Sequence, residues 1–156
     1  AALNQADCSQ GINMIVPVDK NNESEWAALC TALWPDYTTR DILRLKAEGK
    51  FKTDFLYLSE GKAIAFMSLS LRHDYVQGTH SSPVGYLEGI YVTPEWRGKG
   101  IAKALVAHAK TWTMEQGCSE LGSDVIYGNE ASLAFHKKVG FREDNTIVCF
   151  SMQVKA

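Results

Sequence analysis

The sequence of 156 residues lacks the patterns that define several protein classes. It has no run of about 20 apolar residues, so no segment is expected to span a bilayer. Its 16 basic residues are scattered among 18 acidic ones, which leaves no footprint for nucleic acid or an anionic membrane. The four cysteines include no Cys-x-x-Cys pair, and the four histidines show no metal-ligand spacing. We therefore expect reduced thiols, a cytoplasmic location and no metal.

Two familiar phosphate-binding motifs are also missing. A Walker A loop ends in Gly-Lys-Ser/Thr, whereas Gly98-Lys99-Gly100 is followed by Ile101, which offers no hydroxyl to magnesium. The same glycines do not continue as the Gly-x-Gly-x-x-Gly that opens a dinucleotide-binding βαβ unit. A nucleoside triphosphatase and a dinucleotide-binding fold are therefore not expected.

The length suits one domain, which can bury roughly 70% of the surface that the unfolded chain exposes. We expect this single domain to cover residues 14–156. Residues 1–13 have no hydrophobic periodicity and no signal-peptide pattern, and Met14 resembles a natural start. This first segment is therefore expected to be a tag or a disordered extension.

Hydrophobic periodicity predicts an α/β fold. Helices are expected to begin at a capping box formed by Asn22 and Glu25, at Thr38 or Thr39, at Ile101, and at Asn129. Period-two or apolar strand patterns occupy residues 15–18, 55–58, 63–71, 86–92, 120–126 and 146–154. The order ββ-loop-βαβαβ predicts a mixed central sheet with an antiparallel N-terminal part and a parallel C-terminal part.

The most informative stretch is Arg97-Gly98-Lys99-Gly100-Ile101-Ala102, which joins a predicted strand to a predicted helix. The first N–H groups of a helix have no intrahelical partners, and the helix dipole adds partial positive charge there. A diphosphate can be held at such a turn without a metal, with Arg97 and Lys99 strengthening the field. The alternative is a surface turn whose glycines bind nothing.

Two motifs resemble the GCN5-related N-acetyltransferase (GNAT) superfamily. Arg97, Gly100 and Ala102 match its pyrophosphate loop, Gln/Arg-x-x-Gly-x-Gly/Ala. About thirty residues later, a second match to the family comprises Asn129, Ser132, Lys138, Gly140 and Phe141. The resemblance implies that acetyl-CoA is the cosubstrate, held by the 97–102 loop and by Asn129. It also implies that pantetheine pairs with the strand segment Ile90, Tyr91 and Val92.

Glu88 is the candidate general base for this chemistry. Transfer to an amine needs a neutral nucleophile beside the thioester carbonyl, a donor for the oxyanion and a proton for the thiolate. The two-residue repeat of a strand places Glu88 on one face with Tyr86, Ile90 and Val92. These apolar neighbours would bury the Glu88 carboxylate and raise its pKa toward the range that a general base needs. Alternatively, Glu88 forms a structural ion pair with Arg72, or it binds the substrate ammonium.

Two further residues are candidates around this strand. Asp124 ends the next strand and could bind a cation together with Glu88, although an Asp at such a place is also a common turn former. His136 stands where many family members have the tyrosine that protonates the thiolate. His136 could donate that proton, or it could be a helix surface residue. Tyr91, Tyr127 or solvent are the alternatives.

Phrases outside the acyl-CoA motifs resemble one subgroup, the aminoglycoside 6'-N-acetyltransferases. They are Leu33-Trp34-Pro35, Arg72-His73-Asp74-Tyr75-Val76, Ser81-Ser82-Pro83-Val84, Leu87-Glu88-Gly89-Ile90-Tyr91-Val92 and Ser123-Asp124. The resemblance implies that Trp34, Tyr75, Glu88 and Asp124 line the aminoglycoside site, although both aromatic rings could instead be ordinary packing. Relatives often carry an acid where this chain has Asn145. A homodimer is also implied, in which the loop of residues 73–84 crosses the interface.

The sequence therefore predicts transfer of acetyl from acetyl-CoA to the 6'-amine of aminoglycosides by direct attack, a reaction that confers resistance. Carboxylates suit a polycationic acceptor. Two alternatives stay open: another small polyamine or a peptide amine as the acceptor, and a non-catalytic CoA-binding sensor.

Overall fold

The structure is a computed structural model that describes residues 12–155. Residues 1–11 of the expected extension lie outside this range. Asn13 already belongs to strand β1 (Asn13–Pro17), and the Ile12 carbonyl accepts a hydrogen bond from Glu60 N. The sheet therefore includes Asn13, the last residue of the segment that was expected to be an extension, and Ile12 is hydrogen-bonded to the turn between β2 and β3.

One five-stranded sheet forms the centre of the molecule, in the order β1-β2-β3-β4-β5. The strands β1, β2 (Thr53–Ser59), β3 (Lys62–Arg72) and β4 (Val84–Val92) pair with one another in antiparallel fashion. Strand β5 (Leu121–Ser123) runs parallel to β4. The mixed sheet predicted from the sequence is thus confirmed.

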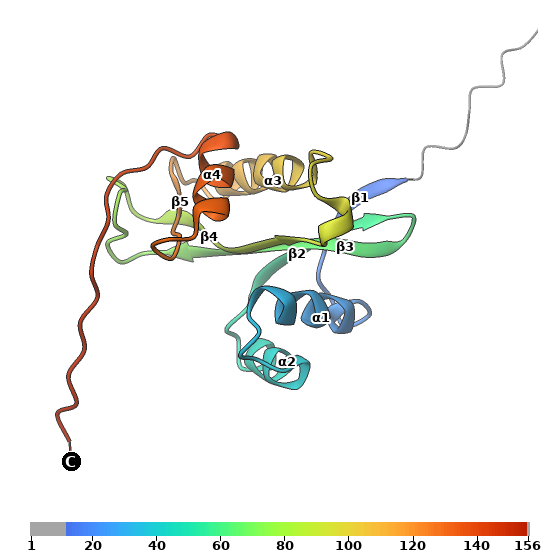
Figure 1. Cartoon of the computed structure of the whole chain (residues 1–156), viewed down its shortest axis with the longest axis horizontal. Helices are drawn as coiled ribbons and strands as arrows, with labels where there is room; N and C mark the ends of the chain where they lie inside the picture. The colour runs from blue at the N-terminus through green and yellow to red at the C-terminus, as the bar shows by residue number, and fades with distance from the viewer. Residues whose placement is uncertain (1–11, 156) are drawn as a thin grey trace, which may run out of the picture.

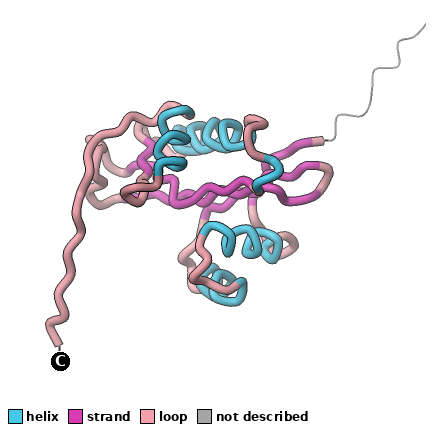
Figure 2. Tube along the Cα trace, in the orientation of Figure 1, coloured by secondary structure: helices cyan, strands magenta, loops and turns pink. Residues whose placement is uncertain are grey.

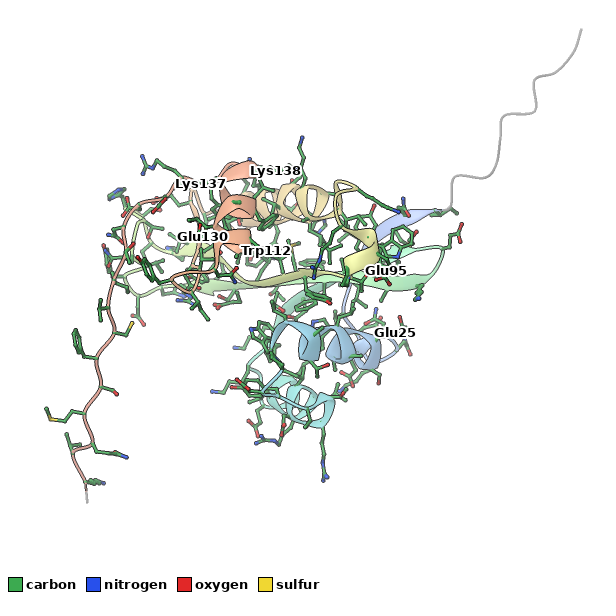
Figure 3. The ribbon with its side chains drawn as sticks, in the orientation of Figure 1. Glu25, Glu95, Trp112, Glu130, Lys137 and Lys138 are labelled. Carbon is green, nitrogen blue, oxygen red and sulfur yellow. The ribbon has the colours of Figure 1, made fainter. Side chains whose placement is uncertain are left out.

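Helices cover both faces of this sheet (Figure 1). Helices α1 (Glu23–Leu33) and α2 (Thr39–Ala47) lie on one face, and α3 (Ile101–Glu115) and α4 (Glu130–Lys138) lie on the other. A short 3-10 helix, η1 (Pro94–Trp96), connects β4 to the loop before α3. Figure 3 shows Trp112 of α3 in the layer between helix and sheet, where it packs against the larger core cluster.

Local signals explain where several elements begin and end. The Thr38 side chain accepts from Asp41 N while Asp41 accepts from Thr38 N, which forms a capping box at α2. The capping box expected at Asn22 and Glu25 is wrong, because Asn22 Oδ1 instead accepts from Asp19 N in the preceding turn.

The C-terminal part of the chain differs most from the sequence prediction. Strand β5 has only three residues instead of the expected run over residues 120–126. Residues 146–154, predicted as a final strand, pair with nothing in the described part of the chain. Figure 2 shows them as an extended loop that leaves the body of the molecule. No helix within residues 12–155 is long and apolar enough to cross a membrane.

Candidate active site

A β-bulge in β4 sets the position of Glu88. Ser68 of β3 pairs with Gly89, whereas the next residue, Leu69, pairs with Leu87. Glu88 is therefore the extra residue of β4, and a bulge of this kind redirects side chains and bends the strand. Leu87, Ile90 and Val92 pack in the cluster on the α3 side, while Tyr91 packs in the cluster on the α1 side. The expectation that Glu88 shares a face with Ile90 and Val92 is wrong, because the bulge shifts the alternation by one residue.

Glu88 is held by polar partners from β3. The Arg72 guanidinium donates to both carboxylate oxygens, with Nη2 at 2.9 Å from Oε1 and 2.8 Å from Oε2. The Ser70 hydroxyl donates to Oε1 at 2.6 Å. The Glu88 side chain retains 33% of its exposure, so solvent and a ligand can reach it. The ion pair that was considered as an alternative role for Glu88 is present in this structure.

Arg72 also connects Glu88 to the second candidate carboxylate. The centre of its guanidinium lies 3.5 Å from the centroid of the Tyr86 ring. Tyr86 Oη donates a hydrogen bond to Asp124 Oδ2 at 2.6 Å. Burial and the neighbouring Asp124 carboxylate raise the pKa of Tyr86, so the phenol keeps its proton. Glu88 and Asp124 are thus joined through Arg72 and Tyr86 on one side of the sheet.

Trp34 borders this group from the end of α1. A Cβ atom placed on Gly89 would lie 2.6 Å from Trp34 Cζ2, so only glycine allows the indole to lie this close to β4. The indole also packs against Phe51 and Phe66, with ring centroids 5.7 and 5.8 Å away. Trp34 therefore belongs to the core and at the same time forms a wall one residue from Glu88.

Two other expected acceptor residues lie farther from these contacts. Tyr75 is 77% exposed on the loop of residues 73–83. Asn145 is exposed and follows Asp144, whose side chain lies against Gly78 of the same loop. Neither residue forms a hydrogen bond or an ion pair with Glu88, whose partners within the described residues are Ser70 and Arg72.

The glycine turn has the form expected of an anion site. Gly98 and Gly100 have φ values of +75° and +81°, and Gly100 is the N-cap of α3. Arg97 is anchored by a hydrogen bond from its Nε to Val92 O at 2.9 Å, and the Lys99 ammonium lies over the Trp96 ring. The first turn of α3 contains no acidic residue, so nothing within it offsets the positive end of the helix dipole.

The edge of β4 between Glu88 and this turn has no strand partner. Pairing between β4 and β5 covers only Gly85–Leu87 and Leu121–Ser123. Beyond Leu87 this pairing ends, so the segment Ile90–Val92 has no strand partner on that side within the described residues, and the Val92 carbonyl accepts from Arg97 Nε. An extended ligand can pair with such an edge through backbone hydrogen bonds. Asn129 caps α4 by accepting from Ser132 N at 3.1 Å.

His136 is buried and has both ring nitrogens engaged. Its Nδ1 lies 2.7 Å from the Ser132 carbonyl, which can only accept, so Nδ1 carries a proton. Its Nε2 lies 2.8 Å from Ser123 Oγ, which in turn lies 3.3 Å from the carbonyl of Leu87. Any proton that leaves through Nε2 must therefore pass through the Ser123 hydroxyl.

Sequence reasoning missed three members of this site, namely Ser70, Tyr86 as the partner of Asp124, and Ser123 as the partner of His136. The signal for Ser70 was present, since Ser70 and Arg72 alternate on β3 opposite Tyr86 and Val84. Among the described residues, no group of three or more His, Cys, Asp or Glu side chains is placed to hold a metal ion.

A fold of this class, with a strand that opens toward a glycine turn, is that of N-acetyltransferases. The family described as Acetyltransferase (GNAT) matches residues 20–141, and the chain belongs to it. The chain is 37% identical to aminoglycoside N(6')-acetyltransferase type 1 of Stenotrophomonas maltophilia, over 92% of this chain and 94% of the relative. It is 40% identical to the protein of that name from Serratia marcescens, over 88% and 97% of the two chains.

Solved structures agree with these relationships. An aminoglycoside 6'-N-acetyltransferase from Acinetobacter haemolyticus matches with a TM-score of 0.86 and 34% identity, over 91% of this chain and 99% of that one. AAC(6')-Iy in complex with the bisubstrate analogue CoA-S-monomethyl-acetylneamine matches with a TM-score of 0.83 and 33% identity, over 91% and 99%.

Proposed function

We propose that this protein transfers acetyl from acetyl-CoA to the 6'-amine of aminoglycosides by direct attack of the amine on the thioester. One observation carries the proposal: a single strand, β4, holds a solvent-accessible carboxylate at its bulge and leads into the glycine turn. Between these two points β4 has no strand partner on its β5 side within the described residues. The similarity to aminoglycoside N(6')-acetyltransferases along nearly the whole chain supports the same reaction.

The donor half of the site uses mainly backbone groups. The turn of residues 97–102 and the first N–H groups of α3 would bind the pyrophosphate, and the open edge at Ile90–Val92 would pair with pantetheine. A backbone N–H on that edge is suited to stabilise the oxyanion, while Asn129 borders the pantetheine from α4.

The acceptor half is acidic and aromatic. We place the substrate ammonium at Glu88, where it would compete with Arg72 for the carboxylate. Asp124 would contact a second amine of the polycation, and Trp34 and Tyr75 would face its sugar rings. Once bound, the 6'-ammonium loses a proton to Glu88 directly or through one water, since the reaction needs the neutral amine.

The proposed reaction is tested by mixing the protein with acetyl-CoA and kanamycin or tobramycin and following free thiol. Mass spectrometry of the product should place one acetyl group on the 6'-nitrogen. An aminoglycoside with a hydroxyl at the 6' position is the matched control and should release no thiol above background. Thiol release with small polyamines or peptides but not with these drugs would show that the acceptor is another amine and not an aminoglycoside. CoA binding without turnover on any amine would leave only a CoA-binding protein.

We also infer that the chain works as a homodimer, as the family resemblance implies. The loop of residues 73–84 is proposed to lie at the interface. It is tied to its own chain by Glu120, which accepts from His80 N and Ser81 Oγ, so it presents a defined surface to a second copy.

A further inference from the structure

A charged pair is buried between α2 and the sheet. The Asp54 side chain of β2 retains only 1% of its exposure and the Lys46 side chain of α2 retains 16%, and Lys46 Nζ lies 2.8 Å from Asp54 Oδ2. The other carboxylate oxygen, Oδ1, accepts from Ser68 Oγ of β3 at 2.5 Å. Each oxygen of the buried carboxylate therefore has its own donor, as a buried charge requires. We call Lys46, Asp54 and Ser68 the Asp54 cluster.

The surroundings of the Asp54 cluster are apolar. Lys46 Nζ lies 4.8 Å from the centroid of the Trp26 ring, and Leu56 and Phe66, the next residues on the same faces of β2 and β3, are fully buried. Taking two charges out of water costs about as much free energy as their attraction returns, so apolar residues of similar volume often stabilise a core equally well. What a fully paired network adds is one fixed arrangement of the groups that it joins.

Ser68 lies opposite the bulge that positions Glu88. Asp54 pairs with Ser68 across β2 and β3, and Ser68 pairs with Gly89 across β3 and β4, directly before the register shifts. Gly89 has no side chain to fix its place, and a glycine weakens the strand that contains it. The hydrogen bond from Ser68 to Asp54 thus ties β3 to β2 at the position of β3 that faces the bulge.

The same strand holds Glu88 one step farther along. Ser70 comes two residues after Ser68, so its side chain lies on the same face of β3. The Ser70 hydroxyl donates to Glu88 Oε1, as the Ser68 hydroxyl donates to Asp54 Oδ1. Two neighbouring serines of β3 therefore bind a buried carboxylate of β2 and the candidate base of β4. A slide or twist of β3 at Ser68 would move the donor that orients Glu88.

Lys46 extends the cluster to the aromatic wall of the acceptor site. Its Nζ also donates to the Phe51 carbonyl at 3.2 Å. The centroid of the Phe51 ring lies 5.2 Å from that of Trp26 and 5.7 Å from that of Trp34. Trp34 is the ring that lies against Gly89, one residue from Glu88. Lys46 is thus linked to β4 through Asp54 and Ser68, and to Trp34 through Phe51.

We propose that Lys46, Asp54 and Ser68 are positioning residues for the acceptor site, which hold the bulge of β4 and the Trp34 indole in place from the core. They act through their neighbours and need no contact with the substrate. A displacement of about 1 Å in a reacting group can lower a rate by about 10²-fold, so a fixed support contributes to turnover. This proposal rests on the proposed acetyl transfer with Glu88 as the base.

The first test removes one hydroxyl and leaves the ion pair intact. Ser68→Ala should lower kcat for tobramycin by roughly tenfold while CoA affinity, measured by calorimetry, stays the same. Ser68→Thr keeps a hydroxyl on a residue that suits a strand and should restore most of kcat. Ser59→Ala is the matched control, at another buried serine of β2 that is 8% exposed. Wild-type kcat in Ser68→Ala, or an equal loss in Ser59→Ala, overturns the proposal.

The second test removes both charges together. Lys46→Met combined with Asp54→Asn leaves no unpaired buried charge, so the variant should stay folded, and the asparagine can still accept from Ser68. Because the link from Lys46 to Phe51 is lost, KM for tobramycin should rise by roughly 3- to 10-fold, as expected when one aromatic contact is weakened. Ser68→Ala, in contrast, should act mainly on kcat. A wild-type KM in the double variant overturns the role of the cluster in placing Trp34.

The third test needs no turnover and separates this proposal from the proposed function. Amide hydrogen exchange should become faster in residues 68–70 and 87–90 of Ser68→Ala, and it should stay at wild-type rates there in Ser59→Ala. Unchanged exchange in Ser68→Ala, or a uniform increase over the whole sheet, overturns the positioning role whatever the activity. Absence of acetylation by the wild-type protein overturns the proposed function instead, and the exchange rates then still report whether Ser68 holds the bulge.

Discussion

Arg72 and Glu88 face each other across β3 and β4, and the guanidinium donates to both carboxylate oxygens at 2.8–2.9 Å. A bidentate pair fixes the plane of a carboxylate better than a single bond does. The pair also provides a positive group that an incoming ammonium can replace. Glu88 is therefore held in one orientation before the substrate binds.

Glu88→Gln is expected to lower kcat/KM for an aminoglycoside by roughly 10²- to 10⁴-fold, since an amide can neither accept the proton nor attract the ammonium. The affinity for CoA, measured by calorimetry, should not change, because the proposed CoA site lies at the other end of β4. Glu25→Gln is the matched control, at an exposed carboxylate on α1 across the sheet from α3 and α4 (Figure 3). Wild-type turnover in Glu88→Gln would show that Glu88 is not the general base.

Gly89→Ala tests the close approach of Trp34 to the bulge. The added Cβ atom would lie 2.6 Å from the indole, so either the ring or the bulge must move. We expect unfolding free energy to fall by about 1–3 kcal/mol, as in other overpacked cores, and kcat/KM to fall as well. Trp34→Phe replaces the indole with a smaller ring, so Gly89→Ala should lower the unfolding free energy by less in that background. Additive effects in denaturant titrations would show that the two residues are not coupled.

The glycine turn and the bulge of β4 show what the sequence alone could and could not predict. The glycine turn before α3 was predictable because the glycines and the following helix are local features. The orientation of Ile90 was not, because counting by two from Glu88 cannot detect an extra residue. A bulge exists only in relation to the partner strand, here Ser68 and Leu69 of β3. Residues 146–154 were mispredicted for the same reason. They have the composition of a strand, but a strand also needs a neighbouring strand to pair with.

Gly100→Ala tests the turn of residues 97–102 as the proposed site for the pyrophosphate of acetyl-CoA. At φ +81° an added Cβ meets no atom within 4 Å, so the change only penalises the left-handed backbone. That penalty is about 1–2 kcal/mol, which corresponds to a loss of CoA affinity of roughly tenfold if the turn must keep this shape to bind. Gly117→Ala, at φ +77° and equally open, carries the same strain at the far end of α3 and should leave CoA affinity unchanged.

His136 is proposed to protonate the leaving thiolate through Ser123. If so, Ser123→Ala and His136→Gln should each lower kcat by a similar factor, on the order of 10², and the double variant should be no slower than either single one. If Ser123→Ala keeps the wild-type kcat, the proton comes from solvent or from a tyrosine.

Glu120 gives a pH dependence whose sign follows from its hydrogen bonds. The Ser81 hydroxyl, and then the His80 N–H, favour the ionised carboxylate and lower the pKa of Glu120 below its usual value. A lowered pKa in the folded state contributes stability above the unfolded pKa, and this contribution is lost as the pH falls through the folded value. Glu120→Ala should therefore lower Tm at neutral pH, and its difference from the wild type should shrink as the pH falls below the ordinary pKa of a glutamate and through the lowered pKa of Glu120. At neutral pH the variant should also show faster amide exchange in residues 80–82. A Tm difference that stays constant down to low pH would mean that Glu120 holds the loop by packing and not by its charge.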